Sequence, residues 1–417
     1  MKKSWFSSGL FLRMILMKKS ISYYDYIIIG ASKAGLTAAT VLREIQKDAA
    51  ILIINGEDRL PYKRTHLTKF LARGFDTDDF ALEKRAWFQE QCIDLLDSPA
   101  QSIDSKEKSL RCADDKKYFW GTLLLATGAV PKELSIPGHQ WLSHLRTARD
   151  TESIRAKLLQ CKDVLVLGQG VEGVELAEQC SRLGLTVTLI GRDDRLMKRW
   201  LDESQSARLL ALLEQKGVRC IFGQSPCEIG KEGEGYTMKC DNQQFHGDMI
   251  LSSTGICGNP VLAEDLGIYA QTGVPTDLYC QTEIPGIYAA GDVVQTPPGW
   301  PTGLWHWAEY LGTVAAMNMG GQKQMMENRP TRLKSEPFGS FYYSMSYQEV
   351  QSSDKSDVFM DNDRGYVRIF SREGRSISAL MTGLGKGISK ILDAGVKIGK
   401  APGKIFATIE EAMKDGE

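Results

Sequence analysis

The sequence predicts an α/β fold made of two parallel-sheet domains and a small C-terminal α+β domain. Two observations support the parallel sheets. An apolar run, a glycine turn, a helical pattern and a second apolar run follow one another near Gly30, and the same order returns near Gly168. From about Pro330, aromatic and polar residues alternate, which is typical of an antiparallel sheet. The length of 417 residues also favours several domains over a single hydrophobic core.

The first repeat begins with the apolar run Tyr23 to Ile29, which we predict to be a buried strand. The turn GASKAG, from Gly30 to Gly35, leads into a helical pattern over Leu36 to Gln46 and a second strand over Ala50 to Ile54. Two strands joined by a helix in this way form a parallel βαβ unit.

The second repeat has the same order. Asp163 to Leu167 and Thr186 to Ile190 are predicted strands, and the turn GQGVEG, from Gly168 to Gly173, precedes a predicted helix over Val174 to Leu183. Three further apolar runs stop at small polar turns, where buried parallel strands direct their last backbone groups toward a ligand crevice. These runs are Leu123 to Gly128, Met249 to Gly255 and Ile287 to Asp292.

The C-terminal part has a different texture. Phe338 to Ser346 and Gly365 to Ser371 alternate as antiparallel strands do, and a final helix is predicted over Ile405 to Lys414. The tail from Gly383 is rich in glycine and lysine, and its glycines are expected to break any amphipathic helix.

Composition excludes several classes of protein. The formal net charge of -1 gives no basic footprint for nucleic acid, and no run of about 20 apolar residues predicts a membrane span. The nine cysteines never lie closer than seven residues apart, so no metal site and no iron-sulfur cluster is predicted. Reduced thiols favour a cytoplasmic location. Met1 to Leu16 is expected to be a disordered or spurious extension, with Met14 or Met17 as alternative starts.

The two glycine turns predict phosphate binding, because a phosphate needs backbone N–H groups at a helix N-terminus and no side chain in the way. Gly168, Gly170 and Gly173 fit this requirement. Gly30 and Gly35 fit it too, but Ser32 takes the place of the middle glycine and adds a Cβ where the chain should approach the pyrophosphate.

An acid at the end of the second strand binds a ribose hydroxyl in such units. Glu57 is in place in the first repeat, which suits the adenosine of FAD. In the second repeat Gly191 takes that position and Arg192 follows, which favours NADPH. Asp193 and Asp194 would repel a 2′-phosphate, so the choice between NADH and NADPH stays open.

The order of these motifs resembles the flavoproteins with two dinucleotide-binding domains. It comprises the Gly30 and Gly168 turns, ATG at Gly128, STG at Gly255 and AAGD at Asp292. More narrowly, LPYKR with LTK, and GLWHWA, resemble the NAD(P)H-dependent rubredoxin and ferredoxin reductases; these segments are Leu60 to Arg64, Leu67 to Lys69 and Gly303 to Ala308.

The resemblance implies two Rossmann-like dinucleotide-binding domains. The FAD-binding domain would be discontinuous, over 21–140 and 250–325, with an NAD(P)-binding domain inserted at 141–249. A C-terminal α+β domain with the basic tail would cover 326–417, and 1–20 would be the extension. The residues implied to hold FAD are Gly30, Ser32, Gly35, Glu57, Arg64, Lys69, Thr127, Gly128, Gly291 and Asp292. Those implied for NAD(P)H are Gly168, Gly170, Gly173, Glu175, Arg192 and Gly255.

Three residues would take part in catalysis. The resemblance puts Glu175 at the nicotinamide, Lys69 beside the flavin ring, and Trp305 near both rings. Each has an ordinary alternative: a helix-capping glutamate, a solvated lysine and a core tryptophan. Disulfide reductases of this kind place a redox cysteine where Lys69 stands, so thiol chemistry at the flavin is disfavoured.

The leading functional hypothesis is an NAD(P)H reductase for a small one-electron carrier such as rubredoxin or ferredoxin. An NAD(P)H oxidase and a nucleotide-sensing flavoprotein with little turnover are the alternatives. Lysines in the C-terminal tail form a candidate docking patch for an acidic carrier, although a solvated tail is the more common explanation of such a charge run; they are Lys386, Lys390, Lys397, Lys400 and Lys404. A homodimer is also possible.

Overall fold

The structure is a computed structural model that describes residues 22–241, 243–297, 303–327 and 329–414. The expected N-terminal extension lies outside these residues. Contacts divide the chain into two compact units. The first unit contains the described residues of Met1–His66, Phe75–Lys132 and Gly255–Asn328, and the second those of Leu67–Gly74, Glu133–Thr254 and Arg329–Glu417.

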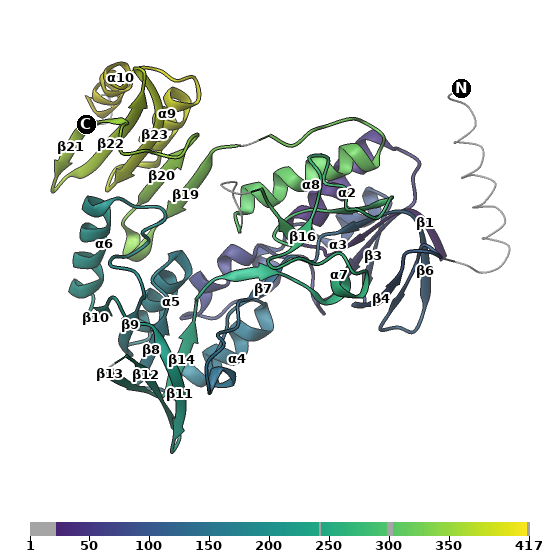
Figure 1. Ribbon diagram of the computed structural model, residues 1–417, viewed down its shortest axis with the longest axis horizontal. Helices are drawn as coiled ribbons and strands as arrows, with labels where there is room; N and C mark the ends of the chain where they lie inside the picture. Colours follow the sequence, from purple (N-terminus) through teal and green to yellow (C-terminus); the bar gives the residue numbers. More distant parts are fainter. Residues whose placement is uncertain (1–21, 242, 298–302, 328, 415–417) are drawn as a thin grey trace. The chain divides into compact units, whose positions relative to one another are not determined.

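The first unit is built on a seven-stranded mixed sheet with the order β3-β2-β1-β6-β5-β4, to which β17 adds beside β6 (Figure 1). Pairing is parallel among β3, β2, β1, β6 and β17, whereas β4 and β5 form an antiparallel edge. The strands are β1 Ser22–Ile29, β2 Ile51–Asn55, β3 Ile93–Asp97, β4 Ala100–Asp104, β5 Ser109–Cys112, β6 Lys117–Leu125 and β17 Ile287–Ala289. Smaller elements are α3 Arg85–Glu90, α7 Val261–Asp265, and the pairs β7 Ala129–Pro131 with β15 Ile256–Gly258 and β16 Val274–Pro275 with β18 Val294–Gln295.

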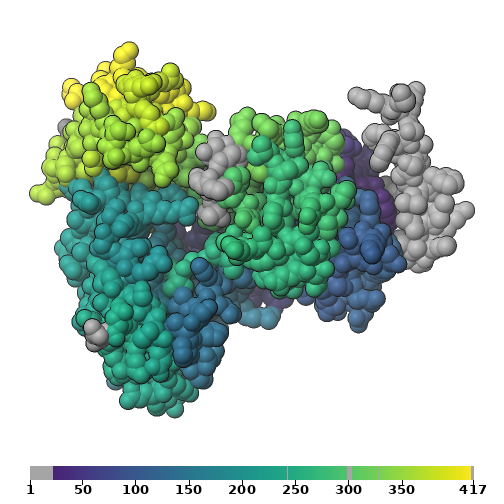
Figure 2. Space-filling model, in the orientation of Figure 1, coloured from purple at the N-terminus to yellow at the C-terminus, as the bar shows by residue number. Residues whose placement is uncertain are grey.

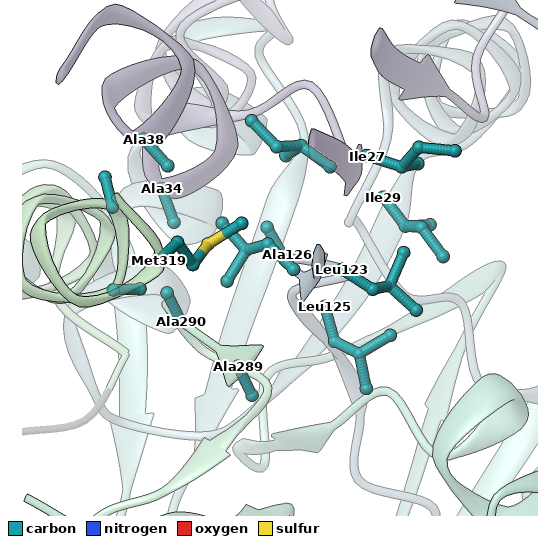
Figure 3. Packing of buried hydrophobic residues seen from close by; sticks show 14 of the residues in the cluster. Ile27, Ile29, Ala34, Ala38, Leu123, Leu125, Ala126, Ala289, Ala290 and Met319 are labelled. Atoms are coloured by element: carbon teal, nitrogen blue, oxygen red, sulfur yellow. The ribbon is translucent and has the colours of Figure 1, made fainter. Parts of the chain in front are cut away.

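Two helices of the first unit, α2 (Lys33–Ile45) and α8 (Trp305–Met319), pack closely together. A Cβ built on Gly312 would lie 2.4 Å from the carbonyl oxygen of Ala34, so the glycine lets the two backbones approach. Small side chains, including those of Ala34, Ala38 and Ala290, line this part of the core, and Met319 fills the space between them (Figure 3).

The second unit contains a four-stranded parallel sheet with the order β10-β9-β8-β14. Its strands are β8 Asp163–Leu167, β9 Thr186–Ile190, β10 Val218–Ile221 and β14 Met249–Ser252, so the predicted strands β8 and β9 are confirmed at both ends. The same unit contains three helices, α4 (Ala148–Leu158), α5 (Val171–Arg182) and α6 (Glu203–Gln215). An antiparallel sheet of three strands, β11 Pro226–Glu232, β12 Gly235–Cys240 and β13 Gln243–Gly247, belongs to the same unit.

A five-stranded antiparallel sheet, β19-β20-β23-β22-β21, completes the second unit and confirms the antiparallel prediction. The strands are β19 Thr331–Ser335, β20 Tyr342–Ser346, β21 Lys355–Asn362, β22 Gly365–Arg372 and β23 Arg375–Thr382, followed by α9 Lys386–Lys397 and α10 Pro402–Lys414. The surface of this C-terminal segment is green-yellow to yellow in Figure 2.

The expectation that glycines prevent an amphipathic helix in the tail is wrong. Helix α9 covers that stretch and buries Ile388, Leu392 and Val396, while Lys390 and Lys397 are exposed. Glycine lowers helix propensity, but burial of an apolar face outweighs that cost in a folded domain.

Polar contacts join the C-terminal sheet to α6. The Gln205 side-chain amide donates to the carbonyl oxygen of Met381 at 3.0 Å and to the hydroxyl of Thr382 at 2.8 Å. Arg208 pairs with Asp361 at 2.6 Å. No helix in the described part of the chain is long and apolar enough to cross a bilayer.

Candidate functional site

The first glycine turn follows β1 and excludes side chains at two of its positions. Gly30 has φ +111°, and a Cβ there would lie 2.1 Å from the carbonyl oxygen of Ala126. A Cβ on Gly35 would lie 1.9 Å from the carbonyl oxygen of Gly30. Only glycine satisfies both constraints. The turn therefore brings the N-terminus of α2 directly behind the end of β1, where its N–H groups can receive a phosphate.

The second glycine turn repeats this packing around β8. Gly168 has φ +118°, and a Cβ there would lie 2.3 Å from the carbonyl oxygen of Ser253. A Cβ on Gly173 would lie 1.9 Å from the carbonyl oxygen of Gly168. The two turns thus share the same contacts as well as the same spacing. Each is a cradle that a Cβ would fill, and the two fit the pyrophosphates of FAD and of NAD(P)H.

The serine at the middle of the first turn fits without backbone strain. Ser32 is the N-cap of α2 with φ -82° and ψ -165°, which any residue adopts. Gly170 has nearly the same angles at the start of α5, and a Cβ there would meet no described atom within 4 Å. The backbone geometry therefore accommodates the Cβ of Ser32.

Glu57 and Arg64 come together beyond the end of β2. The Arg64 guanidinium forms an ion pair with the Glu57 carboxylate, and the Tyr62 hydroxyl donates to that carboxylate at 2.6 Å. The same guanidinium lies 5.2 Å from the centre of the Tyr62 ring. The structure thus gathers two predicted FAD residues into one cluster, and Tyr62 is a partner that sequence reasoning missed.

The turns after β6 and β17 also adjoin the start of α2. Gly128 and Gly291 have positive φ, and a Cβ on Gly291 would lie 2.9 Å from the Cβ of Ala34. Thr127 and Asp292 are half-buried beside them. These turns and the Gly30 turn therefore meet at one end of the parallel sheet in the first unit.

Trp305 is the first residue of α8, and it lies beside Lys33, the first residue of α2. The ammonium of Lys33 lies 5.8 Å from the centre of the Trp305 ring and 2.7 Å from a carboxylate oxygen of Glu309. Trp305 is half-buried, whereas Trp307 is a core residue at 2% exposure. Lys33 and Glu309 are a further pair that sequence reasoning missed. Gly255, also in the first unit, has φ +112° and open space around its Cβ position among the described residues.

In the second unit the structure brings Lys69 and Glu175 close together. The short helix η2 (Thr68–Phe70) packs against α5, and the Thr68 hydroxyl donates a hydrogen bond to the Glu175 carboxylate. Burial raises the pKa of Glu175, while the Thr68 hydrogen bond and the charge of Lys69 oppose that shift. Lys69 is exposed, and so is Arg192, whose side chain is 81% accessible.

Glu172 is an ionisable residue within the second turn to which the sequence analysis assigned no role. Its carboxylate accepts a hydrogen bond from the Ser253 hydroxyl at 3.3 Å. Burial raises the pKa of Glu172 to about 7, and the negative charge of Glu175 adds to this rise. The Ser253 hydrogen bond and the positive charge of Arg146 act in the opposite direction. The first turn of α5 therefore carries a carboxyl group that is half-protonated near neutral pH.

Glu172→Gln is expected to remove a pH dependence of stability. Because the pKa of Glu172 is raised from 4.5 to about 7 in the folded protein, folding binds protons between these values, and stability falls as pH rises through them. The free energy of unfolding should fall by on the order of 2 kcal/mol for a pKa shift of this size. Urea unfolding at about pH 5 and pH 8 measures it. An equal loss in wild type and Glu172→Gln would contradict the assignment, and Glu214→Gln on α6 is the control.

Known proteins resemble this chain over about two thirds of its length. The sequence model of the family described as pyridine nucleotide-disulphide oxidoreductase matches residues 24–307. The ferredoxin–NAD(+) reductase component of the p-cumate 2,3-dioxygenase system of Pseudomonas putida is 34% identical over 276 residues, which are 66% of this chain and 68% of that protein. The rubredoxin–NAD(+) reductase of Ectopseudomonas oleovorans is 30% identical over 284 residues, 66% of this chain and 74% of that protein.

Solved structures show the same fold. A ferredoxin reductase from Rhodopseudomonas palustris superposes with a TM-score of 0.77 at 24% identity, covering 86% of this chain and 91% of that one. The structural similarity covers 86% of this chain, a larger part than residues 24–307, which the family model matches. The α/β prediction with two dinucleotide-binding folds is therefore confirmed.

Proposed function

Because this chain belongs to the pyridine nucleotide-disulphide oxidoreductase family, we propose that it is a reductase that passes electrons from NAD(P)H through FAD to a small protein carrier of the rubredoxin or ferredoxin type. The observation that carries the proposal is the pair of glycine turns, in which Gly30 and Gly168 pack on a strand-end carbonyl in the same way. Two such turns supply one binding site for each dinucleotide.

The residues of the first unit fit FAD. Gly30, Ser32 and Gly35 would receive the pyrophosphate, Glu57 would bind the adenosine ribose, and Asp292 a ribityl hydroxyl. Arg64, Thr127, Gly128 and Gly291 would complete the site. When bound, FAD accepts a hydride and releases electrons singly or in pairs. The corresponding domain would comprise 21–140 and 250–325.

The residues of the second unit fit NAD(P)H. Gly168, Gly170 and Gly173 would receive its pyrophosphate, and Arg192 would lie near the adenosine ribose. Gly255, which belongs to the first unit, would be a further NAD(P)H contact. The NAD(P)-binding domain would comprise 141–249, and 326–417 would form the C-terminal domain. Glu175, held by Thr68, would orient the nicotinamide amide, and Trp305 would pack beside the ring.

We also propose that electrons leave without thiol chemistry. Lys69 follows Thr68 in η2, where a disulfide reductase would carry sulfur, and its ammonium group would stabilise the negative charge of the reduced cofactor. All nine cysteines are free thiols. Burial raises the pKa of Cys180 and of Cys280 to about 12, which keeps both protonated and unreactive. Free thiols also support a cytoplasmic location.

The acceptor would be acidic, because exposed lysines lie along one side of α9 and around the start of α10. Lys390, Lys397 and Lys404 are exposed, whereas Lys386 pairs with Glu336 at 2.9 Å and Lys400 bonds to Thr408 at 3.3 Å. These three exposed lysines form the proposed carrier patch. A homodimer would be compatible with this arrangement.

The expected result for purified protein is a yellow flavoprotein that NAD(P)H bleaches and that reduces rubredoxin or ferredoxin faster than oxygen. Carrier reduction should slow by roughly tenfold between about 50 mM and 500 mM salt, because charge attraction is screened, while ferricyanide reduction should change little. Stopped-flow spectroscopy and oxygen uptake measure both properties. Colourless protein that cannot take up FAD would refute the proposal, and dominant oxygen reduction would favour an oxidase.

The lysine patch has its own variant. Replacing Lys390, Lys397 and Lys404 with glutamine should flatten the salt profile of carrier reduction and leave ferricyanide reduction unchanged. Lys216→Gln, on the exposed end of α6, is the matched control. A salt profile that stays steep in the triple variant would move the docking surface elsewhere.

A further inference from the structure

Gly191 is a glycine for a reason other than backbone conformation. It follows β9, at the position where Rossmann-like units carry the ribose-binding acid. Its φ lies outside the left-handed region, so the backbone there tolerates any residue. A Cβ on Gly191 would, however, lie 1.4 Å from Oε1 of Gln169 and 2.8 Å from its Cβ. The Gln169 side chain occupies the space that a side chain at position 191 needs.

Gln169 is locked in that space by hydrogen bonds. Its Oε1 accepts from the backbone N–H of Asp193 at 3.2 Å, and its Nε2 donates to the carbonyl oxygen of Arg195 at 2.6 Å. Its carbonyl oxygen also accepts from the N–H of Met197 at 2.9 Å, and the residue is only 6% exposed. The carboxamide therefore holds the loop after β9 in one conformation and presents no negative charge to a ligand.

The same loop carries cations. Arg192 is largely exposed and lies 3.7 Å from Asp193, a loose contact. Lys198 and Arg195 hold Asp194 at 2.9 Å and 3.6 Å, and the Lys198 contact in particular lowers its pKa. Lys198 and Arg195 therefore offset the charge of Asp194, while Asp193 has only the loose contact with Arg192, whose guanidinium stays accessible.

From these contacts we infer that Gln169 and Gly191 together select NADPH over NADH, because the side chain of Gln169 occupies the space that an acidic side chain at position 191 would need. Gln169 fills the place of the ribose-binding acid with a neutral amide that is hydrogen-bonded to the loop, and Arg192 receives the 2′-phosphate. A carboxylate at this position would accept a ribose hydroxyl and repel the phosphate. The inference rests on the proposed function and specifies the coenzyme that the second unit takes.

The two positions should behave interdependently. Gly191→Glu alone should lower the melting temperature and weaken both coenzymes, because the new side chain clashes with Gln169. Gln169→Gly combined with Gly191→Glu removes the clash, so it should recover part of the lost stability and invert the coenzyme preference, although the two Gln169 hydrogen bonds to the loop are also removed. Wild type should favour NADPH in kcat/KM by roughly tenfold or more, and the double variant should favour NADH by a similar factor, as one charged hydrogen bond predicts.

Arg192→Ala tests the cation separately. It should reduce kcat/KM for NADPH by roughly 10- to 100-fold and reduce kcat/KM for NADH by a much smaller factor, because NADH has no 2′-phosphate. Arg219→Ala, an exposed arginine on β10, is the matched control and should alter neither coenzyme. Calorimetry with adenosine 2′,5′-bisphosphate and with 5′-AMP gives a readout independent of turnover: wild type should bind the bisphosphate more tightly, and the double variant should not.

Three outcomes would overturn the inference: wild type that prefers NADH, a double variant whose preference stays within about threefold of wild type, or Gly191→Glu that is as stable as wild type. Failure of the proposed function looks different. In that case the protein would bind no FAD, or neither coenzyme would bleach an FAD that dithionite still reduces.

Discussion

Gly30→Ala is expected to yield protein that has lost FAD, and Gly168→Ala protein that keeps its yellow colour but is reduced by neither coenzyme. In each case the new Cβ would lie within 2.3 Å of a strand-end carbonyl oxygen at a residue with strongly positive φ. Strain and overpacking together cost on the order of 2–5 kcal/mol, which is enough to open a turn and to weaken ligand binding by at least a hundredfold.

The ratio of flavin to protein absorbance, the melting temperature and bleaching by NAD(P)H or dithionite measure these effects. Gly286→Ala and Gly217→Ala are matched controls, because both residues have positive φ but would place no described atom within 3.8 Å of the new Cβ. The controls should keep FAD and coenzyme reduction. A Gly30→Ala variant with normal FAD content would contradict the assignment of the first turn.

The second large effect is expected for Lys69→Met, in which the rate of hydride transfer and the flavin reduction potential should both fall. If the Lys69 ammonium stabilises the reduced cofactor, its removal should lower the flavin reduction potential and slow hydride transfer by about a hundredfold, the usual effect of losing one electrostatic contact at a reacting centre. It should also raise the pKa of Glu175 further, because the charge of Lys69 opposes the upward shift that burial causes.

Stopped-flow reduction by NAD(P)H and a redox titration test this prediction. Lys69→Arg keeps the charge and should recover most of the rate, while Lys216→Met at the far end of α6 should behave as wild type. Equal potentials and equal rates in Lys69→Met and wild type would assign Lys69 to the ordinary class of solvated lysines.

Several features of the fold could be predicted from local pattern alone. The strands β8 and β9 are short runs that stop directly before a glycine, and the bounds predicted for both agree with the structure. Helices were less exact: α2 begins at Lys33 and α5 at Val171, three residues before the predicted starts, because helical hydrogen bonding begins inside the glycine turn. Helix α9 was missed for another reason, since its apolar face is stabilised by the sheet beneath it.

By itself the sequence determined the two glycine turns, the strands that precede them and the position of Glu57 after the second strand. These features can be predicted because they depend on neighbouring residues and, at the turns, on the absence of a side chain. Only the tertiary structure decided what fills position 191 and what surrounds Glu172. Parallel pairing of Leu167 with Ile190 brings Gln169 beside Gly191, and β14 brings Ser253 to Glu172. Contacts between separate strands depend on register and packing, which local sequence pattern does not specify.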